Sequence, residues 1–194
     1  MRHVVIIGPQ GSGKGTQAER IAPAYNLVHL ATGVIFRALM QEDSALSDEV
    51  RQFVDKGELV PDDLTVRVLM DKLDRSPEDH GYSGALLDGF PRNRPQLDVL
   101  DQVIAQRGDE LAAVIHLAVP KDVLTERLEL RARDDDNPEA LRRRFGIYFT
   151  ETEPLLDVWR ERGIVLDING NRTIDQVTAE IERGLAARRT RREA

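Results

Sequence analysis

Residues 8–16 read Gly8-Pro9-Gln10-Gly11-Ser12-Gly13-Lys14-Gly15-Thr16 and follow the apolar run 4–7. Glycine lacks a side chain, so main-chain N–H groups in such a loop can turn inward and approach an anion closely. Lys14 adds a positive charge, and a helix beginning near Gly15 adds unpaired N–H groups and the positive end of its dipole. Strand, loop, lysine and helix in this order predict a polyphosphate-binding loop. The alternative is a glycine turn that carries a lysine by chance.

One position departs from the general pattern GxxxxGK followed by Ser or Thr. Gly15 stands where that pattern places the hydroxyl that binds magnesium, and Thr16 comes one residue later. Bound Mg²⁺ keeps several waters. We therefore expect the metal to be held mainly by phosphate oxygens and water, with Thr16 as an additional candidate ligand.

The composition limits the class of protein. The chain has 194 residues, a net charge of -7 and no cysteine, which argues against a general nucleic-acid binder and excludes a disulfide framework or a thiolate zinc site. A strand begins within the first few residues, and no apolar run approaches the roughly 18 residues of a membrane span. We expect one compact domain over 1–194 in a cytoplasmic protein without a membrane or nucleic-acid partner.

Apolar, β-rich runs recur at 4–7, 27–30, 85–87, 112–119 and 164–168. Sequence of helical character separates each run from the next, and the runs are apolar at nearly every position. This alternation predicts an α/β fold in which a five-stranded parallel sheet lies between two layers of helices. Ligands of such folds bind at the carboxyl ends of the strands, where the motifs of this chain also lie.

The segment between the second and third runs is too long for a simple crossover. It contains predicted helices at about 44–56 and 61–75, separated by Gly57. Because it has few apolar residues and no strand of its own, we expect a small helical flap rather than a second domain. The acidic turn 134–138, between two arginine-bearing helices, is a second candidate flap.

Further motifs follow the glycine loop. They are Thr32-Gly33 with Arg37, Gly57-Glu58-Leu59-Val60-Pro61-Asp62, Asp88-Gly89-Phe90-Pro91-Arg92 with Gln96, and an arginine series ending Arg142-Arg143-Arg144-Phe145. As a set that covers nearly the whole chain, they resemble the adenylate kinase family. The resemblance implies a P-loop α/β/α kinase domain with an AMP-binding flap at 32–61 and a short lid at about 131–139. It also implies reversible phosphoryl transfer from MgATP to AMP, giving two ADP.

The acceptor in this reaction is an anionic phosphate oxygen, so a general base is unnecessary and catalysis reduces to alignment and charge neutralisation. The motifs accordingly offer many arginines and no pair of a histidine with a carboxylate. We interpret His3, His29, His80 and His116 as structural residues of strands or loops.

The resemblance divides the binding residues between two nucleotides. The implied ATP-binding residues are Gly11, Ser12, Gly13, Lys14, Gly15, Thr16, Arg127 and Gly170. The implied AMP-binding residues are Thr32, Arg37, Glu58, Leu59, Val60, Gly89, Phe90, Pro91, Arg92, Gln96, Arg133 and Arg144. In this assignment Arg127 stacks on the ATP adenine, Arg92 clamps the AMP phosphate and Gln96 pairs with the adenine edge of AMP. Asp88 holds Mg²⁺ through water.

The implied catalytic residues are Lys14, Asp88, Arg92, Arg131, Arg133 and Arg144. The last three of these arginines would surround the transferring phosphoryl group. Arg127 and Arg131 are four residues apart on the helix expected after Pro120 and therefore share a face. The alternative is that the arginines pair with 134–136 and Glu139 on a solvated surface, which we prefer for 142 and 143.

Simpler interpretations remain for the acceptor motifs. Thr32 also fits a helix N-cap, 61–63 fits a helix start, and 88–92 fits a Gly-Pro turn with a cap. Val34 follows Thr32-Gly33 where relatives often have an acidic residue, so the acceptor pocket departs from the family there.

The lid is the second departure. Many bacterial relatives carry roughly thirty residues, sometimes with zinc, between the arginines equivalent to Arg131 and Arg133. Here only Ala132 separates them, which predicts the short-lid form without zinc.

Two other functions stay open. A UMP or CMP kinase shares the loop and the turn 88–92, but its relatives usually have alanine where this chain has Thr32, which favours AMP. A nucleotide-binding switch without phosphoryl transfer would carry a guanine-reading NKxD string, which the chain lacks. We expect ATP, AMP and ADP as partners of a monomer.

Overall fold

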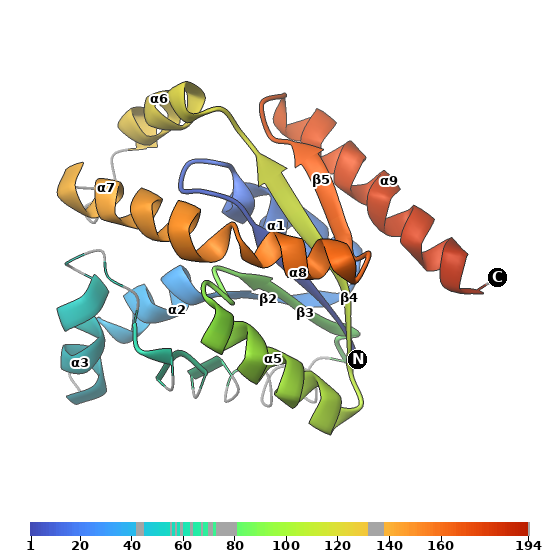
Figure 1. Ribbon diagram of the computed structural model, residues 1–194, viewed down its shortest axis with the longest axis horizontal. Helices are drawn as coiled ribbons and strands as arrows, with labels where there is room; N and C mark the ends of the chain where they lie inside the picture. Colours follow the sequence, from blue (N-terminus) through green and yellow to red (C-terminus); the bar gives the residue numbers. More distant parts are fainter. Residues whose placement is uncertain are drawn as a thin grey trace.

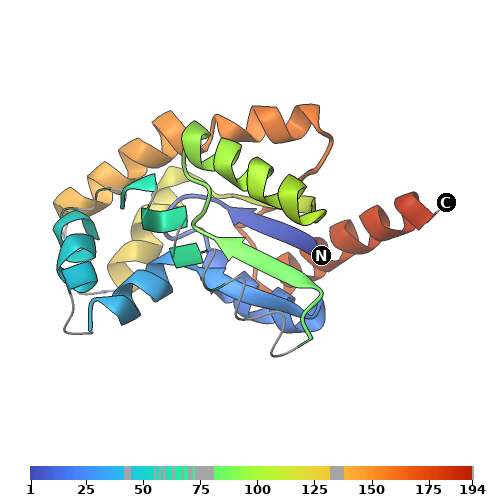
Figure 2. The ribbon, with the colours of Figure 1, turned by 90° about the horizontal axis from the view of Figure 1, so that it is seen from below.

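The computed structural model describes residues 1–41, 45–54, 56, 58, 60–62, 64–66, 68, 69, 72, 81–131 and 138–193. Its strands are β1 (Arg2–Ile7), β2 (Leu27–Ala31), β3 (Gly84–Asp88), β4 (Glu110–Ala118) and β5 (Val165–Asn169). Its helices are α1 (Lys14–Ala24), α2 (Thr32–Leu39), α3 (Ala45–Val54), α5 (Arg94–Arg107), α6 (Lys121–Arg131), α7 (Pro138–Ile147), the π-helix η1 (Tyr148–Thr152), α8 (Leu155–Glu161) and α9 (Ile174–Glu193). Figure 1 shows their arrangement, and Figure 2 shows α9 extending away from the sheet toward the end of the chain.

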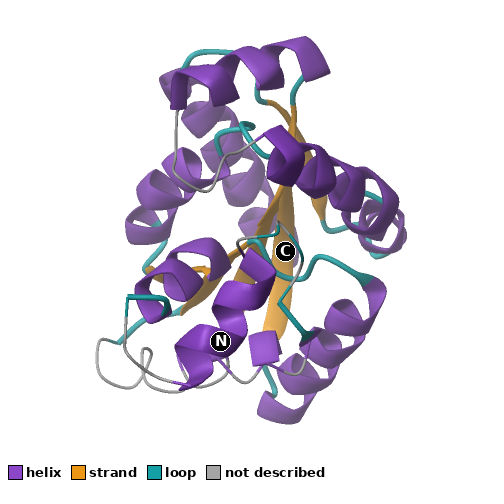
Figure 3. Cartoon of the chain, turned by 90° about the vertical axis from the view of Figure 1, so that its left-hand side faces the viewer, coloured by secondary structure: helices purple, strands orange, loops and turns teal. Residues whose placement is uncertain are grey.

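The strands form one parallel sheet in the order β2-β3-β1-β4-β5. This confirms the predicted five-stranded α/β fold, and the observed bounds differ from the apolar runs by at most two residues. The differences arise because an apolar run marks the buried centre of a strand, whereas strand ends such as Arg2 and Asn169 are polar and exposed. Figure 3 shows the strands between two layers of helices.

Side chains of β1 alternate between two separate cores. Val5 and Ile7 pack into the core beneath α5 and α8, which contains the fully buried Trp159. Val4 and Ile6 pack into the core beneath α1 and α9. Both faces of the sheet are therefore covered, which explains why the central strands are apolar at successive positions.

The carboxyl ends of three strands meet at one edge of the sheet. Ile6 of β1 is in register with Asp88 of β3 and Ile115 of β4, and Asp88 is in register with Ala31 of β2. The glycine loop leaves β1 at this edge, in the centre of the strand order. It therefore lies beside the turns that follow β2 and β3, where open α/β sheets bind their ligands.

The segment after β2 has a small core of its own. Phe36, Val50, Val60 and Leu64 are buried together there, apart from the two cores of the sheet. α3 corresponds to the helix predicted at 44–56, and in the range 61–75 the described residues 62, 64–66, 68, 69 and 72 are helical.

Two predicted features fall outside the part of the chain that the structure describes. They are the linker residue Gly57 and positions 134–137 of the acidic turn 134–138, and the predicted His80 also lies outside that part. In the described residues, no helix combines the length and the apolar character that a membrane crossing requires.

Candidate functional site

The loop between β1 and α1 has a backbone that only glycine adopts easily. Gly11 and Gly13 have φ angles of 83° and 93°, in the left-handed region. A Cβ atom on Gly8 would lie 2.7 Å from the Ser12 hydroxyl oxygen, so a side chain there would close the loop. The Ser12 hydroxyl is buried and has no hydrogen-bond partner among the described residues. The loop thus presents one hydroxyl without a described partner to the cavity that it lines.

Lys14 is the first residue of α1, one position before the predicted start of the helix. Its ammonium group donates hydrogen bonds to the carbonyl oxygens of Gly8 (2.6 Å) and Pro9 (3.0 Å). These contacts hold the positive charge over the loop, close to the N–H groups of the first helical turn. An anion bound in the loop would therefore meet a cation and a helix N-terminus together.

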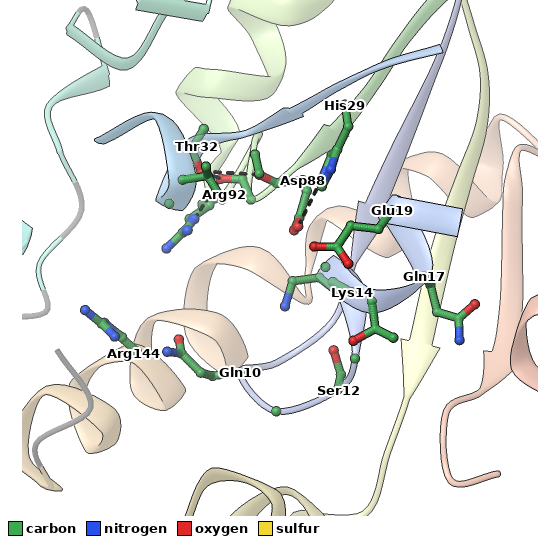
Figure 4. Close-up of a pocket in the computed structure, with 18 of the residues that line it drawn as sticks. Gln10, Ser12, Lys14, Gln17, Glu19, His29, Thr32, Asp88, Arg92 and Arg144 are labelled. Carbon is green, nitrogen blue, oxygen red and sulfur yellow. Dashed lines mark hydrogen bonds and ion pairs between the residues drawn. The ribbon is translucent and has the colours of Figure 1, made fainter. Parts of the chain in front are cut away.

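Asp88, the last residue of β3, faces the loop from the neighbouring strand. Its Oδ2 atom lies 3.6 Å from Nε2 of His29 on β2, as Figure 4 shows. Burial raises the pKa of the Asp88 carboxyl. The His29 imidazole and the charges of Lys14 and Arg92 lower this pKa by more, so it lies below its ordinary value and the group is ionised at neutral pH.

Main-chain and side-chain contacts fix Arg92 in the turn after β3. Its Nε donates to the Gly89 carbonyl (2.7 Å), its main-chain N–H donates to Oε1 of Gln96 (2.8 Å), and its carbonyl accepts from the Thr152 hydroxyl (2.6 Å). Burial lowers the pKa of Arg92, Asp88 raises it, and the charge of Arg144 lowers it further. The two guanidinium groups thus repel each other, and an anion between them would relieve that repulsion.

These groups line one cavity of about 550 Å³. The predicted residues that line it are Gly11, Ser12, Gly13, Lys14, Gly15, Thr16, Thr32, Arg37, Glu58, Val60, Asp88, Gly89, Arg92, Gln96, Arg127, Arg144 and Gly170. Six of the described lining residues are Lys or Arg and three are Asp or Glu, so the cavity carries an excess of positive charge. Figure 4 shows Lys14, Arg92 and Arg144 around the same space, although they come from three different elements.

The cavity joins the residues predicted for two nucleotides. Arg127 on α6 donates a 3.0 Å hydrogen bond to the carbonyl of Gly170, which brings together the two residues expected at the ATP adenine. Thr32, Arg37 and Val60, which belong to the flap 32–61, line the same cavity.

Some predicted residues are not brought to this cavity. Phe90 and Pro91 line a smaller neighbouring cavity of about 70 Å³, and Phe90 packs into the core beneath α5. The turn directs Gly89 and Arg92 toward the main cavity, so the two residues between them face the protein interior. Leu59 and Arg133 lie outside the described residues, as does the side chain of Arg131 on α6.

The N-cap interpretation of Thr32 is wrong. Thr32 is the first residue of α2, the N-cap is Ala31, and no side chain caps the helix. Instead the Thr32 hydroxyl donates to the carbonyl oxygens of Asp88 (3.3 Å) and Gly89 (3.1 Å). This contact ties the start of α2 to the turn that carries Arg92. A Cβ atom on Gly89 would lie 2.5 Å from the same hydroxyl, so the approach requires glycine.

Sequence reasoning missed several residues of the cavity wall. His29 lies in a strand, as predicted, but it also lines the cavity, together with Glu19 and Arg172. The position of His29 carried a signal, because it precedes Thr32 by three residues on a strand that ends at the ligand-binding edge of the sheet. Glu19 lies one helical turn after Gly15 and so shares its face of α1.

Known proteins resemble this chain over nearly its full length. The chain is 41% identical to the adenylate kinase of Clavibacter michiganensis subsp. michiganensis over 195 aligned positions, which cover 98% of this chain and 96% of the relative. It is 39% identical to the adenylate kinase of Cyanothece sp. over 186 positions, which cover 94% of each chain. It is 35% identical to that of Caldanaerobacter subterraneus subsp. tengcongensis over 213 positions, which cover 94% of this chain and 95% of the relative.

A family model described as adenylate kinase matches residues 6–164, from the end of β1 to the residue before β5. The match spans the glycine loop, the flap and the arginine-bearing helices. The chain belongs to the adenylate kinase family.

Proposed function

We propose that the protein catalyses reversible transfer of the terminal phosphoryl group of ATP to AMP, forming two ADP. One observation carries the proposal: Lys14, Arg92 and Arg144 line the same cavity as the glycine loop on one side and the flap on the other. Two nucleotides bound from these two sides would direct their phosphates toward the same cations. Alignment and charge neutralisation then supply the catalysis, because the acceptor oxygen is already anionic.

In this proposal the site residues have three roles: they bind the donor nucleotide, bind the acceptor phosphate and neutralise the charge of the transferring group. The loop amides and Lys14 hold the donor phosphates, and Arg127 with Gly170 contacts the donor adenine. Arg37 and Arg92 hold the acceptor phosphate, because their guanidinium groups offer paired donors to phosphate oxygens. Arg144, together with Arg131 and Arg133, neutralises the charge that develops on the transferring group. The roles of these residues are supported by their positions in the cavity where the side chains are described.

Mg²⁺ is part of the proposal, bound to the phosphates of ATP. When bound it neutralises phosphate charge and orients the phosphoryl group. The chain fits this group through Asp88, an ionised carboxylate beside the loop, and a Cβ atom on Gly15 would lie 3.9 Å from its Oδ2 atom. Among the described residues no three His, Cys, Asp or Glu side chains form a metal cluster. In this proposal Asp88 holds the ion through water and Thr16 is the candidate direct ligand, with phosphate oxygens and water completing the shell.

The acceptor nucleobase and the assembly state are also proposed. AMP is favoured over UMP and CMP by Thr32 and by the glutamine at position 96, both of which line the cavity. A monomer is supported because one chain supplies the loop, the flap and the arginines. We expect it to act in the cytoplasm.

The test is incubation with ATP, Mg²⁺ and each nucleoside monophosphate in turn, with diphosphate formation as the readout. We expect AMP to be phosphorylated faster than UMP, CMP or GMP. A pyrimidine acceptor that reacts faster than AMP would assign the chain to the UMP and CMP kinases instead.

Binding of a linked diadenosine polyphosphate distinguishes a kinase from a switch. A transferase that holds both nucleotides binds the linked compound with one-to-one stoichiometry, and both ATP and AMP compete with it. Competition by ATP alone, with no diphosphate formed, would contradict the proposal.

A further inference from the structure

The amide of Gln96 is held at both of its ends. Gln96 lies in the first turn of α5, is 2% exposed and lines the cavity. Its Oε1 atom accepts a 2.8 Å hydrogen bond from the main-chain N–H of Arg92. Its Nε2 atom donates a 2.7 Å hydrogen bond to Oδ1 of Asp62. The orientation of the amide is therefore set by one donor and one acceptor of the protein itself.

Asp62 directly follows Pro61, the last residue of the flap 32–61, at the start of the next helical segment. Its Oδ1 atom also accepts a 3.1 Å hydrogen bond from Nδ2 of Asn93, the N-cap residue of α5. Asn93 in turn accepts from the main-chain N–H of Gln96 (2.9 Å) through its own Oδ1 atom. Two side-chain amides thus fix one carboxylate oxygen, and this carboxylate joins the segment that follows the flap to the helix that carries Gln96.

A glutamine amide has two N–H groups and two acceptor lone pairs. The contacts with Arg92 and Asp62 use one of each, which leaves one N–H group and one lone pair. Rotation of the amide by half a turn would place its oxygen against the carboxylate and its NH₂ group against the N–H of Arg92. Both hydrogen bonds would be lost. The amide oxygen would face the carboxylate oxygen, which is also an acceptor, and the NH₂ group would face the N–H of Arg92, which is also a donor. The fixed amide therefore presents its donor and acceptor in one spatial order only.

We propose that Asp62 is a positioning residue that sets the purine specificity of the acceptor site. The order that it fixes matches a purine with an amino group at C6 and an acceptor nitrogen at N1. A 6-oxo purine presents the same two functions in reversed order and would require the rotated amide. The inference rests on the proposed function, because Gln96 can read the base only if AMP occupies this part of the cavity.

Asp62→Asn tests the inference with little change in shape. An asparagine amide can present either an oxygen or an NH₂ group to Gln96, so residue 62 no longer fixes the orientation of the Gln96 amide. The N–H of Arg92 remains, and the effect is therefore partial. We expect the ratio of kcat/KM for AMP to that for IMP to fall by about tenfold. The KM for ATP and the melting temperature should stay close to those of the wild type.

Asn93→Ser is the matched control. Serine retains the N-cap of α5 and removes the other hydrogen bond to Asp62, but it leaves the bond between Asp62 and Gln96. We expect its AMP to IMP ratio to equal that of the wild type. Asp62→Ala, which removes the acceptor entirely, is the second variant, and its ratio should fall at least as far as that of Asp62→Asn.

Calorimetric titration of AMP and IMP gives a readout that does not depend on turnover, and the affinity ratio should change in the same direction. An unchanged ratio in both Asp62 variants would overturn the inference, as would an equal fall in Asn93→Ser. A wild-type protein that does not phosphorylate AMP would contradict the proposed function instead, so the two failures are distinguishable.

Discussion

The hydroxyl of Thr152 donates a 2.6 Å hydrogen bond to the main-chain carbonyl oxygen of Arg92. Thr152 ends the π-helix η1, which continues from α7, and it is 6% exposed. Arg144, Tyr148 and Thr152 follow one another at intervals of four residues. Arg144 lines both the main cavity and the smaller cavity beside the turn after β3, and Tyr148 and Thr152 line the smaller one. One helical surface therefore supplies an arginine and also supports the backbone of a second.

Thr152→Val removes this hydrogen bond while keeping the shape of the side chain. The part-buried carbonyl of Arg92 loses its side-chain donor, which costs about 0.5–1.5 kcal/mol of stability. Because Arg92 is held by this turn, we expect kcat to fall by about tenfold, since small displacements of a positioned group reduce the rate. Steady-state kinetics and urea unfolding measure the two effects. Thr152→Ser, which restores the hydroxyl, should recover most of kcat, and no recovery would show that packing rather than the hydrogen bond matters.

The fold and the loop could be predicted because both depend on local sequence. Apolar strands of a parallel sheet are visible as continuous runs, and the loop needs glycines at fixed positions next to a lysine. The residues after β3 could be predicted for the same reason, because Gly89 and Pro91 impose a turn that sets Asp88 and Arg92 at the edge of the sheet. The direction of Phe90 and Pro91 could not, since it depends on the core that forms beneath α5.

Lys14→Met removes the positive charge that two main-chain carbonyls hold over the loop. We expect kcat to fall by at least about a thousandfold, because a preorganised charge at the transferring phosphates is lost, while the circular dichroism spectrum stays unchanged. Lys121→Met is the matched control. It removes a lysine that lies 4.5 Å from the centre of the Phe149 ring and does not line the cavity. Comparable losses in the two variants would contradict the role given to Lys14.

The ion pair between Arg143 and Glu58 joins α7 to the flap. Nη1 of Arg143 lies 2.7 Å from Oε1 of Glu58, and the two side chains are 39% and 38% exposed. The interpretation that Arg143 pairs on the surface with 134–136 and Glu139 is confirmed for Glu139, at 3.5 Å, whereas 134–136 lie outside the described residues. The sequence could not indicate the bond to Glu58, because 85 positions separate the partners and either residue could pair with many others. For the same reason, the sequence could not indicate the hydrogen bond between Asp62 and Gln96.

A double-mutant cycle with Arg143→Gln and Glu58→Gln measures this ion pair. Because both side chains are more than one-third exposed, we expect a coupling free energy of about 0.2–1 kcal/mol that decreases with added salt. Glu58 also lines the cavity, so the KM for AMP should rise in each single variant more than kcat falls. Arg142→Gln, in the exposed neighbouring position, should change neither. Additive effects in the cycle would show that the pair does not couple the helix to the flap.

His3 gives the fold a pH dependence at the opposite end of the sheet from the cavity. Its side chain is 1% exposed, its Nδ1 atom accepts a hydrogen bond from the main-chain N–H of Ala85 (3.1 Å), and its Nε2 atom lies 3.0 Å from Oδ2 of Asp109. Burial lowers the pKa of His3, the contact with Asp109 opposes this, and the Met1 amino group and Arg107 lower it further. The net pKa lies below the ordinary value. Protonation would place a second donor against the N–H of Ala85.

The lowered pKa of His3 makes the folded protein less stable at acidic pH, because proton binding and unfolding are linked. Below the unfolded-state pKa of about 6.5, His3 is protonated in the unfolded chain but stays neutral in the folded protein. The free energy of unfolding therefore decreases as the pH falls through this range. The contribution of one histidine is at most about 1.4 kcal/mol per pH unit. Asp109 also has a lowered pKa, but its contribution is lost only at lower pH, below its ordinary value of 3.8. Urea unfolding between about pH 7.5 and 5 should therefore show a smaller decrease in stability for His3→Gln than for the wild type. Equal slopes for the two proteins would mean that His3 takes up its proton as readily in the folded state as in the unfolded chain.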